Sequence, residues 1–199
     1  MSVREPVSRR GGPIRPALSR TAIVEAALAV ADRQGLDAVS MRRVADELET
    51  GASALYVYIQ NRDDLLDAMF DHAMAAVAEA KLPEGDWRER LTSLLLKSIS
   101  TASGHGGLAR VALTTVPSGP NAIAVTERVH ALLAEGGLGE ATIPAALDLL
   151  GLFVTGAALD RVPEPNSEAH RHRLRWEIDV ILSGLIAVGP PAQAPAQDG

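Results

Sequence analysis

Apolar positions along residues 19–188 recur at intervals of three and four, which is the repeat of an α-helix with one buried face. The first such segment shows the pattern clearly, because Ile23, Ala26, Ala27, Val30 and Ala31 share one side. No segment shows the strict alternation of apolar and polar residues that marks a half-buried β-strand. The pattern therefore predicts an all-α protein with about nine helices.

Capping residues set the expected ends of these helices. Ser19, Ser40, Asn61 and Asp86 each precede a helical pattern, where a side-chain oxygen accepts a hydrogen bond from the first turn. Gly35 suits the left-handed backbone that often follows a last turn. The predicted helices cover residues 20–34, 41–48, 53–59, 62–80, 86–103, 107–114, 119–135, 142–160 and 167–188.

The two ends of the chain lack a helical repeat. Residues 1–18 combine arginines with prolines and glycines, which favours a flexible basic arm. Residues 189–199 are rich in proline and are expected to be disordered.

Charge is unevenly distributed along the chain. The net charge is −6, yet residues 1–62 contain nine arginines against seven acidic residues. The excess negative charge therefore lies in residues 63–199. This asymmetry favours a small module that faces a polyanion, attached to an acidic body.

Cysteine is absent, which excludes disulfides, thiolate metal sites and cysteine nucleophiles and favours a reducing, cytoplasmic location. The most apolar window, residues 145–159, is shorter than the ~20 residues that cross a bilayer, and it contains Asp148. We therefore expect a buried helix there and no membrane association.

Two short helices joined by a tight turn, over residues 41–59, follow a longer supporting helix, which is the composition of a helix-turn-helix. The second short helix contains Tyr56 and Tyr58, the only tyrosines in the chain. Leu55 and Ile59 are four residues apart and are expected to pack inward. The outer face then presents small residues that allow close approach to a DNA groove, and phenol hydroxyl groups that reach phosphate oxygens.

Over residues 19–74 the sequence resembles the tetracycline-repressor (TetR) family of transcriptional regulators. The helix-turn-helix of that family reads approximately Ser/Thr-hydrophobic-Arg-x-hydrophobic-Ala, then Leu-Gly, then Leu-Tyr-x-His-Phe-x-x-Lys-x-x-Leu-Leu. The corresponding stretches here are SMRRVA, LE and LYVYIQNRDDLL, at residues 40–45, 48–49 and 55–66. The resemblance implies a DNA-binding domain over residues 19–65 and a ligand-binding and dimerisation domain over residues 66–188.

Three residues depart from the family pattern. Glu49 stands where the family usually has a turn glycine, Tyr58 where it has histidine and Arg62 where it has lysine. Arg62 keeps a cation for phosphate, and Tyr58 keeps a polar aromatic side chain. Glu49 places an anion near DNA that a neighbouring arginine would have to neutralise, and Gly51 is expected to supply the flexibility of the turn.

The family pattern also implies roles for individual side chains. Tyr56 and Arg62 are expected to contact phosphates, and Arg43 is an equally good phosphate contact. Arg42 suits the O6 and N7 atoms of guanine, and the methyl group of Ala54 suits that of thymine. The resemblance places further side chains at or near the bases: Thr50, Ser53 and Tyr58.

The resemblance weakens beyond residue 80, so it does not identify a ligand. In the family this region implies a small-molecule cavity among the middle helices and a dimer interface from the last two long helices. Residues 142–160 and 167–188 fit the interface, because both are apolar on wide faces and contain glycines that allow close helix approach. We expect a largely apolar effector. The pocket candidates, whose alternative role is packing or solvation, are His105, Asn121, His130, Phe153, Thr155 and Trp176.

No sequence feature indicates catalysis. The chain has no Gly-x-Ser-x-Gly, P-loop or His-Glu-x-x-His motif. His170 and His172 are two residues apart on a predicted helix and therefore point to different sides, which disfavours a metal chelate. We therefore expect neither an enzyme nor a metal or cofactor site.

Two functions remain open at this point. The first is a cytoplasmic, nucleoid-associated homodimeric repressor that binds a palindromic double-stranded DNA operator and is released by a small-molecule effector. The second is a helical ligand-binding or dimerisation module in which residues 19–65 are only structural, and which shows no salt-dependent duplex binding. Residues 1–18 are either a disordered overhang or an arm that enters the minor groove.

Overall fold

The computed structural model describes residues 18–104, 107–114, 118–160 and 167–188, and within these ranges it is helical without a β-strand. The predicted all-α class is therefore confirmed. The predicted tail, His105 and the predicted arm apart from Leu18 lie outside the described residues. The helices are α1 (Arg20–Gln34), α2 (Met41–Glu47), α3 (Ala52–Leu55), α4 (Arg62–Ala78), α5 (Trp87–Ser103), α6 (Val111–Thr114), α7 (Pro120–Glu135), α8 (Ile143–Leu159) and α9 (Glu168–Val188), with 3₁₀ turns at Leu36–Ala38 and Leu108–Arg110.

Four helices begin at the capping residues that the sequence predicts. In each case the side-chain oxygen accepts a hydrogen bond from the backbone N–H three residues later. The acceptors and their distances are Ser19 (3.1 Å), Ser40 (3.2 Å), Asn61 (2.9 Å) and Asp86 (2.9 Å). Gly35 ends α1 with a φ of +83°, as expected for a glycine after a last turn.

The second helix of the helix-turn-helix is shorter than predicted. The pattern predicts a helix over residues 53–59, whereas α3 covers only Ala52–Leu55. One further helical hydrogen bond, from the Ile59 N–H to the Leu55 carbonyl at 3.0 Å, continues the turn beyond it. The helix stops there because Asn61 adopts an extended backbone, with φ −160°, to begin α4.

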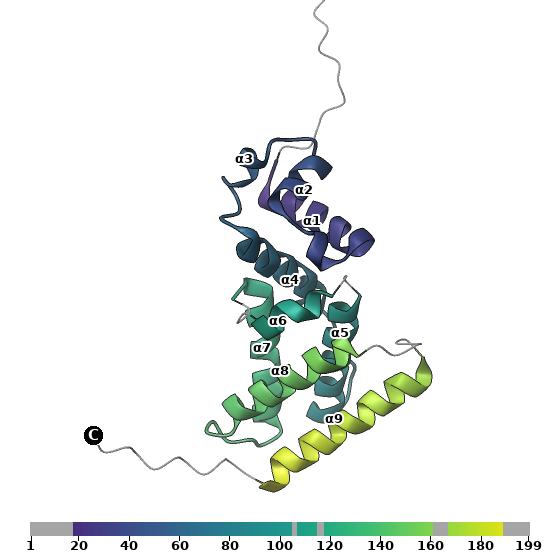
Figure 1. Cartoon of the computed structure of the whole chain (residues 1–199). Coiled ribbons are helices and arrows are strands. Elements are labelled where there is room, and N and C mark those ends of the chain that lie inside the picture. Colours follow the sequence, from purple (N-terminus) through teal and green to yellow (C-terminus); the bar gives the residue numbers. More distant parts are fainter. Residues whose placement is uncertain (1–17, 105–106, 115–117, 161–166, 189–199) are drawn as a thin grey trace, which may run out of the picture.

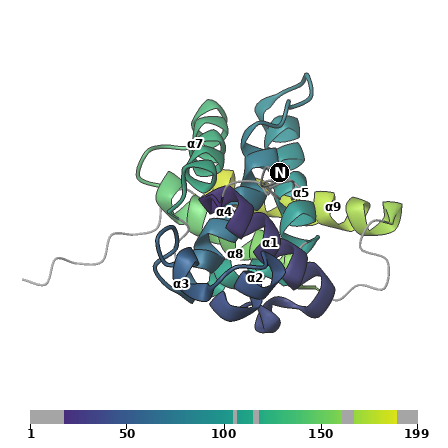
Figure 2. The same cartoon turned by 90° about the horizontal axis from the view of Figure 1, so that it is seen from above.

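The helices form two groups that α4 connects (Figure 1). Helices α1, α2 and α3 lie together at one end, and α9 lies across the other end. Helix α4 packs against α1, α5 and α7, and α5 packs against α8 and α9. Seen from above, α1–α3 lie on one side of the molecule, and α5 and α7 lie on the other (Figure 2).

One apolar core runs through both groups. It extends without a break from Ile23 of α1, through Leu65 and Met69 of α4, to Ile178 and Leu182 of α9. Because α4 contributes buried residues along its length, it joins α1 to the body through one packed core. In the ranges that the structure describes, no helix combines the length and apolar character needed to cross a membrane.

Candidate DNA-binding surface and its link to the body

The turn between α2 and α3 is built around Glu49. Its φ of +49° is the left-handed conformation that a non-glycine residue adopts only at a cost in free energy. The next N–H, that of Thr50, donates to the Ala45 carbonyl at 2.9 Å and closes the end of α2. Gly51 has an ordinary extended backbone, with φ −82°. The expectation that Gly51 supplies the flexibility of the turn is therefore wrong, because Glu49 itself takes the unusual conformation.

Replacing Glu49 by glycine is expected to raise the free energy of unfolding by up to ~1 kcal/mol. Glycine removes the left-handed strain, which is offset in part by its larger entropy in the unfolded chain. Glu49→Gln is the matched control, because it removes the charge but keeps the strain. Urea denaturation of the two variants measures the difference, and equal stability would contradict the strained turn.

The recognition segment, residues 52–59, separates buried from exposed side chains as predicted. Leu55 and Ile59 are fully buried, whereas Tyr56 is 55% and Tyr58 39% exposed. Ser53 is exposed and Ala54 is half-buried. The outer side of the segment therefore presents two phenol rings, Ser53 and part of Ala54, together with Val57, which is 79% exposed.

Two arginines extend the exposed surface onto α2. Arg42 and Arg43 are both exposed, and within the described part of the chain neither forms an ion pair with an acidic side chain. Thr50, at the turn, is half-buried. Arg33 of α1 and Glu47 of α2 form an ion pair at 2.6 Å. The α2–α3 surface thus combines two cationic side chains with the phenol groups of α3.

Arg62 has a structural contact that the sequence pattern did not reveal. Its Nε donates to the Val39 carbonyl at 2.9 Å and its Nη2 donates to the Leu36 carbonyl at 3.2 Å. These carbonyls belong to the link between α1 and α2, so Arg62 joins the start of α4 to that link. The expected phosphate contact of Arg62 stays a prediction, because a guanidinium group has five N–H donors and these bonds use two.

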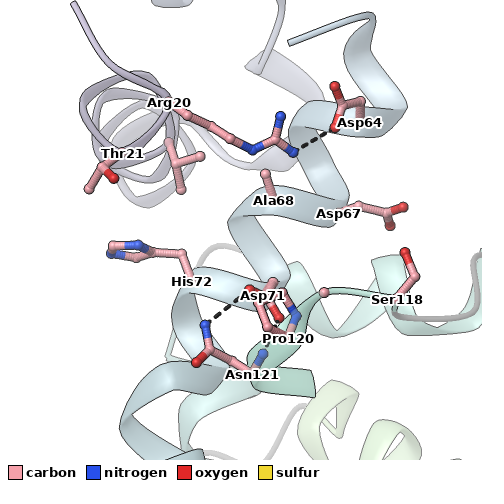
Figure 3. Close-up of a pocket in the computed structure, with 12 residues that line it drawn as sticks. Arg20, Thr21, Asp64, Asp67, Ala68, Asp71, His72, Ser118, Pro120 and Asn121 are labelled. Atoms are coloured by element: carbon pink, nitrogen blue, oxygen red, sulfur yellow. Dashed lines mark hydrogen bonds and ion pairs between the residues drawn. The ribbon is translucent and has the colours of Figure 1, made fainter. Parts of the chain in front are cut away.

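A cleft of about 350 Å³ lies between α1, α4 and the start of α7 (Figure 3). We call it the junction cleft. Arg20 and Asp64 approach each other at one end, and Asp71 and Asn121 lie at the other. The α4 side of the cleft is mainly polar, because Asp64, Asp67, Asp71 and His72 line it. Asn121 is the only described pocket candidate among its lining residues.

Hydrogen bonds of two side chains, Asp71 and Arg128, join α4 to α7. The Asp71 carboxylate of α4 accepts hydrogen bonds from the Asn121 and Ala122 N–H groups, at 2.8 and 3.0 Å, and so caps the start of α7. In return, Arg128 of α7 donates to the carbonyls of Val77, Ala78 and Ala80 at 2.7 Å and so caps the end of α4. Gly119 allows the close approach, because a Cβ there would lie 2.2 Å from the Asp71 side chain.

The remaining described pocket candidates lie apart from the junction cleft. His130 of α7 faces Glu140 at 3.6 Å, and its side chain is 42% exposed. On α8, Thr155 is buried and Phe153 is half-buried. Trp176 of α9 is 64% exposed. Their proposed contact with a ligand stays a prediction.

Helices α8 and α9 both carry exposed apolar side chains. Leu149 and Leu152 of α8 and Trp176 and Val180 of α9 are between 44% and 66% exposed. Glycines lie on the same two helices, and a Cβ at Gly151, Gly156 or Gly184 would meet nothing within 4 Å. We call this surface the α8–α9 face.

Two family models match the chain. One, described as "Bacterial regulatory proteins, tetR family", matches residues 23–69, and the other, "Tetracyclin repressor-like, C-terminal domain", matches residues 79–185. The chain belongs to the tetR family. The first tetR match covers α1–α3 and the start of α4, and the second covers α5–α8 and most of α9.

Curated tetR-type relatives have similar sequences. The HTH-type transcriptional repressor DrrR1 of Streptomyces coeruleorubidus is 34% identical over 79% of this chain and 58% of its own length. An HTH-type transcriptional regulator of Saccharopolyspora erythraea is 34% identical over 72% of this chain and 61% of its own length. The chain therefore spans about three fifths of the length of these two relatives.

Solved structures of the family share the whole fold. Apo ActR from Streptomyces coelicolor has a TM-score of 0.74 at 33% identity, and the match covers 85% of this chain and 95% of ActR. ActR in complex with actinorhodin has a TM-score of 0.76 at 32% identity, covering 89% of this chain and 100% of that one. The structural similarity thus extends through both groups of helices.

Proposed function

We propose that the protein is a ligand-responsive transcriptional repressor that binds double-stranded DNA through α2 and α3. The observation that carries the proposal is the outward face of the helix-turn-helix, where Arg42, Arg43, Tyr56 and Tyr58 are all exposed. The name of DrrR1, a transcriptional repressor, supports the same function. Because its partner is chromosomal DNA, we place the protein in the cytoplasm with the nucleoid.

The exposed side chains divide into phosphate contacts and base contacts. Tyr56, Arg43 and Arg62 hold the phosphates on either side of the groove, which fixes the position of α3 on the duplex. Arg42 reads guanine through O6 and N7, and Ala54 meets a thymine methyl group. The remaining polar side chains of the surface lie close to base edges: Thr50, Ser53 and Tyr58.

A second copy of the chain covers the α8–α9 face in this proposal. Two helices from each protomer form a four-helix interface, and the exposed glycines let the helices approach closely. The two-fold axis of such a dimer presents two α3 helices to successive major grooves, about 34–36 Å apart. The operator is therefore a palindrome.

A small, largely apolar effector in the body releases the operator. ActR has been solved in complex with (S)-DNPA and with actinorhodin, which supports a small-molecule effector for this chain. Candidate contacts are Asn121, His130, Phe153, Thr155 and Trp176. The effector binds more tightly to a dimer whose α3 helices are spaced wrongly for the operator than to the operator-binding dimer. The difference between these two affinities limits how far the effector can weaken DNA binding.

Helix α4 connects the effector region to the DNA-binding surface. It begins at Arg62, beside the recognition segment, and ends where Arg128 of α7 holds its last carbonyls. Asp71 fixes the middle of the helix to the start of α7. A shift of α7 therefore moves α4 as well, and with it the segment that carries α3.

Removing both α2 arginines, as Arg42→Ala with Arg43→Ala, is expected to weaken binding to a mixed-sequence DNA duplex and to flatten its salt dependence. The slope of log K against log salt concentration falls in magnitude by about 0.9 for each phosphate contact that is lost. Fluorescence anisotropy over a series of salt concentrations measures this slope.

Lys97→Ala is the control, because Lys97 is an exposed cation on α5, away from the proposed surface. An unchanged slope in the double arginine variant would show that Arg42 and Arg43 of α2 do not contact DNA phosphates. A wild-type protein that binds no duplex at any salt concentration would instead favour the alternative function, a helical ligand-binding or dimerisation module.

A further inference from the structure

The end of the recognition segment is held by side chains from outside it. The segment has only four residues with full α-helical structure, and the chain then turns through residues 56–61 before α4 begins. An isolated helix of this length does not persist in water, because its nucleation is unfavourable. The position of Tyr58 and its neighbours therefore depends on contacts with α1 and α4.

Arg20 and Asp64 supply those contacts. Arg20, the first residue of α1, donates from Nη1 to the Tyr58 carbonyl at 2.8 Å and from Nη2 to Asp64 Oδ1 at 2.7 Å. The second oxygen of Asp64 accepts from the Gln60 N–H at 2.7 Å. The two side chains thus hold the backbone on both sides of Ile59, and Figure 3 shows them pointing toward one another at the end of the junction cleft.

We propose that Arg20 and Asp64 are positioning residues for DNA recognition, which fix the end of the recognition segment rather than contact the duplex. This inference rests on the proposed DNA-binding function. The Arg20 side chain is 50% and the Asp64 side chain 24% exposed, so the ion pair itself adds little to global stability. Its effect is local, because two hydrogen bonds, at the Tyr58 carbonyl and the Gln60 N–H, hold a short loop to the Arg20–Asp64 pair.

The state of the Asp64 carboxyl is consistent with this role. Partial burial acts to raise the pKa of Asp64, but the hydrogen bonds from Arg20 and from the Gln60 N–H outweigh it. The pKa of Asp64 therefore lies below its ordinary value, and the carboxylate is charged at neutral pH.

Because Asp64 is negatively charged, a positioning role and simple repulsion of phosphate predict opposite effects of removing it. An anion near a DNA-binding surface repels phosphate, so its removal strengthens binding if electrostatics alone acts. If Asp64 positions the recognition segment, its removal weakens specific binding instead. Asp63 is the matched control, because it is an exposed carboxylate on the same first turn of α4.

The test compares Asp64→Asn with Asp63→Asn on a duplex that the wild-type protein selects from a random pool. We expect Asp64→Asn to lose about tenfold in affinity for this duplex, the order of one good polar contact to DNA. On a duplex of scrambled sequence both variants should bind as tightly as the wild type or more tightly. If Asp64 contributed only to global stability, Asp64→Asn would keep the wild-type ratio of affinity for the selected duplex to affinity for the scrambled duplex, when both are measured far below the melting temperature.

Arg20→Lys is the second variant, because lysine keeps the charge but lacks the planar fork that reaches two acceptors at once. We expect it to lower specific affinity in the same way. Equal specific affinity of Asp64→Asn and Asp63→Asn, or of Arg20→Lys and the wild type, would overturn the inference. A wild-type protein that selects no duplex would instead overturn the proposed function on which it rests.

Discussion

Replacing Leu152 by glutamate is expected to convert the proposed dimer to a monomer and to remove its binding to the selected duplex. Leu152 is 66% exposed and lies within the α8–α9 face, beside Gly151. Burying an unpaired carboxylate in each protomer costs about 3–5 kcal/mol. Since 1.4 kcal/mol corresponds to a tenfold change in affinity, the dissociation constant of the dimer rises by roughly a hundredfold or more.

Sedimentation equilibrium measures the mass of this variant, and anisotropy measures its binding to the duplex. Ile123→Glu is the matched control, because Ile123 is a 46% exposed aliphatic residue on α7, outside the α8–α9 face. The control should remain a dimer and bind DNA. A dimeric Leu152→Glu protein with normal affinity would show that the two copies meet through another surface.

Replacing Leu55 by alanine is expected to lower the free energy of unfolding by about 2–5 kcal/mol and to remove specific DNA binding. Leu55 is fully buried, and with Ile59 it is one of two apolar anchors of the recognition segment. The segment is too short to form a helix by itself, so the loss of one anchor releases it from α1 and α2. Helices α5, α7 and α8 should keep their structure, because α3 packs against α2 and these three helices lie in the other group (Figure 1).

Hydrogen exchange resolves the two regions in the Leu55→Ala variant. We expect faster exchange over residues 41–59, with protection in α5 and α7 similar to that of the wild type. Val57→Ala is the control, because Val57 lies two residues away but is 79% exposed, and it should change stability little. Retained specific binding in Leu55→Ala would mean that the recognition segment does not depend on this anchor.

Local sequence signals predicted the helices well. Capping at Ser19, Ser40, Asn61 and Asp86 depends on atoms three residues apart, so it can be read from a short window. The same holds for the buried and exposed sides of the recognition segment. The predicted length of α3 was wrong, because the end of this helix is set by the start of the next helix rather than by its own residues.

Contacts between distant segments were not predictable from the sequence. Asp71 caps a helix that begins about fifty residues later, and Arg128 returns the contact to α4. Arg62 stands where the family usually has lysine, so the sequence suggested a contact with a DNA phosphate. The side chain also donates to the carbonyls of Val39 and Leu36. A sequence pattern gives the type and spacing of such side chains, but their partners are backbone carbonyls, which accept, and backbone N–H groups, which donate, and almost every residue offers both.

The effector site shows the same limit. The pocket candidates were chosen as polar or aromatic residues within apolar helices, but which side of a helix is covered depends on how it crosses its neighbours. In α9 the buried side contains Leu174, Ile178 and Leu182, and this leaves Trp176 on the exposed side. A side chain that is exposed in one copy can be buried against a second copy. Trp176 therefore belongs to the α8–α9 face as well as to the candidate ligand contacts.

Selection of duplexes from a random oligonucleotide pool by the full-length protein, refolded to remove bound small molecules, tests the DNA-binding function most directly. Sequencing of the bound fraction at moderate salt concentration should give an enriched palindrome, with half-sites spaced for two α3 helices in successive major grooves. No enrichment by a folded, dimeric protein would contradict a sequence-specific repressor and leave the helix-turn-helix with a structural role only.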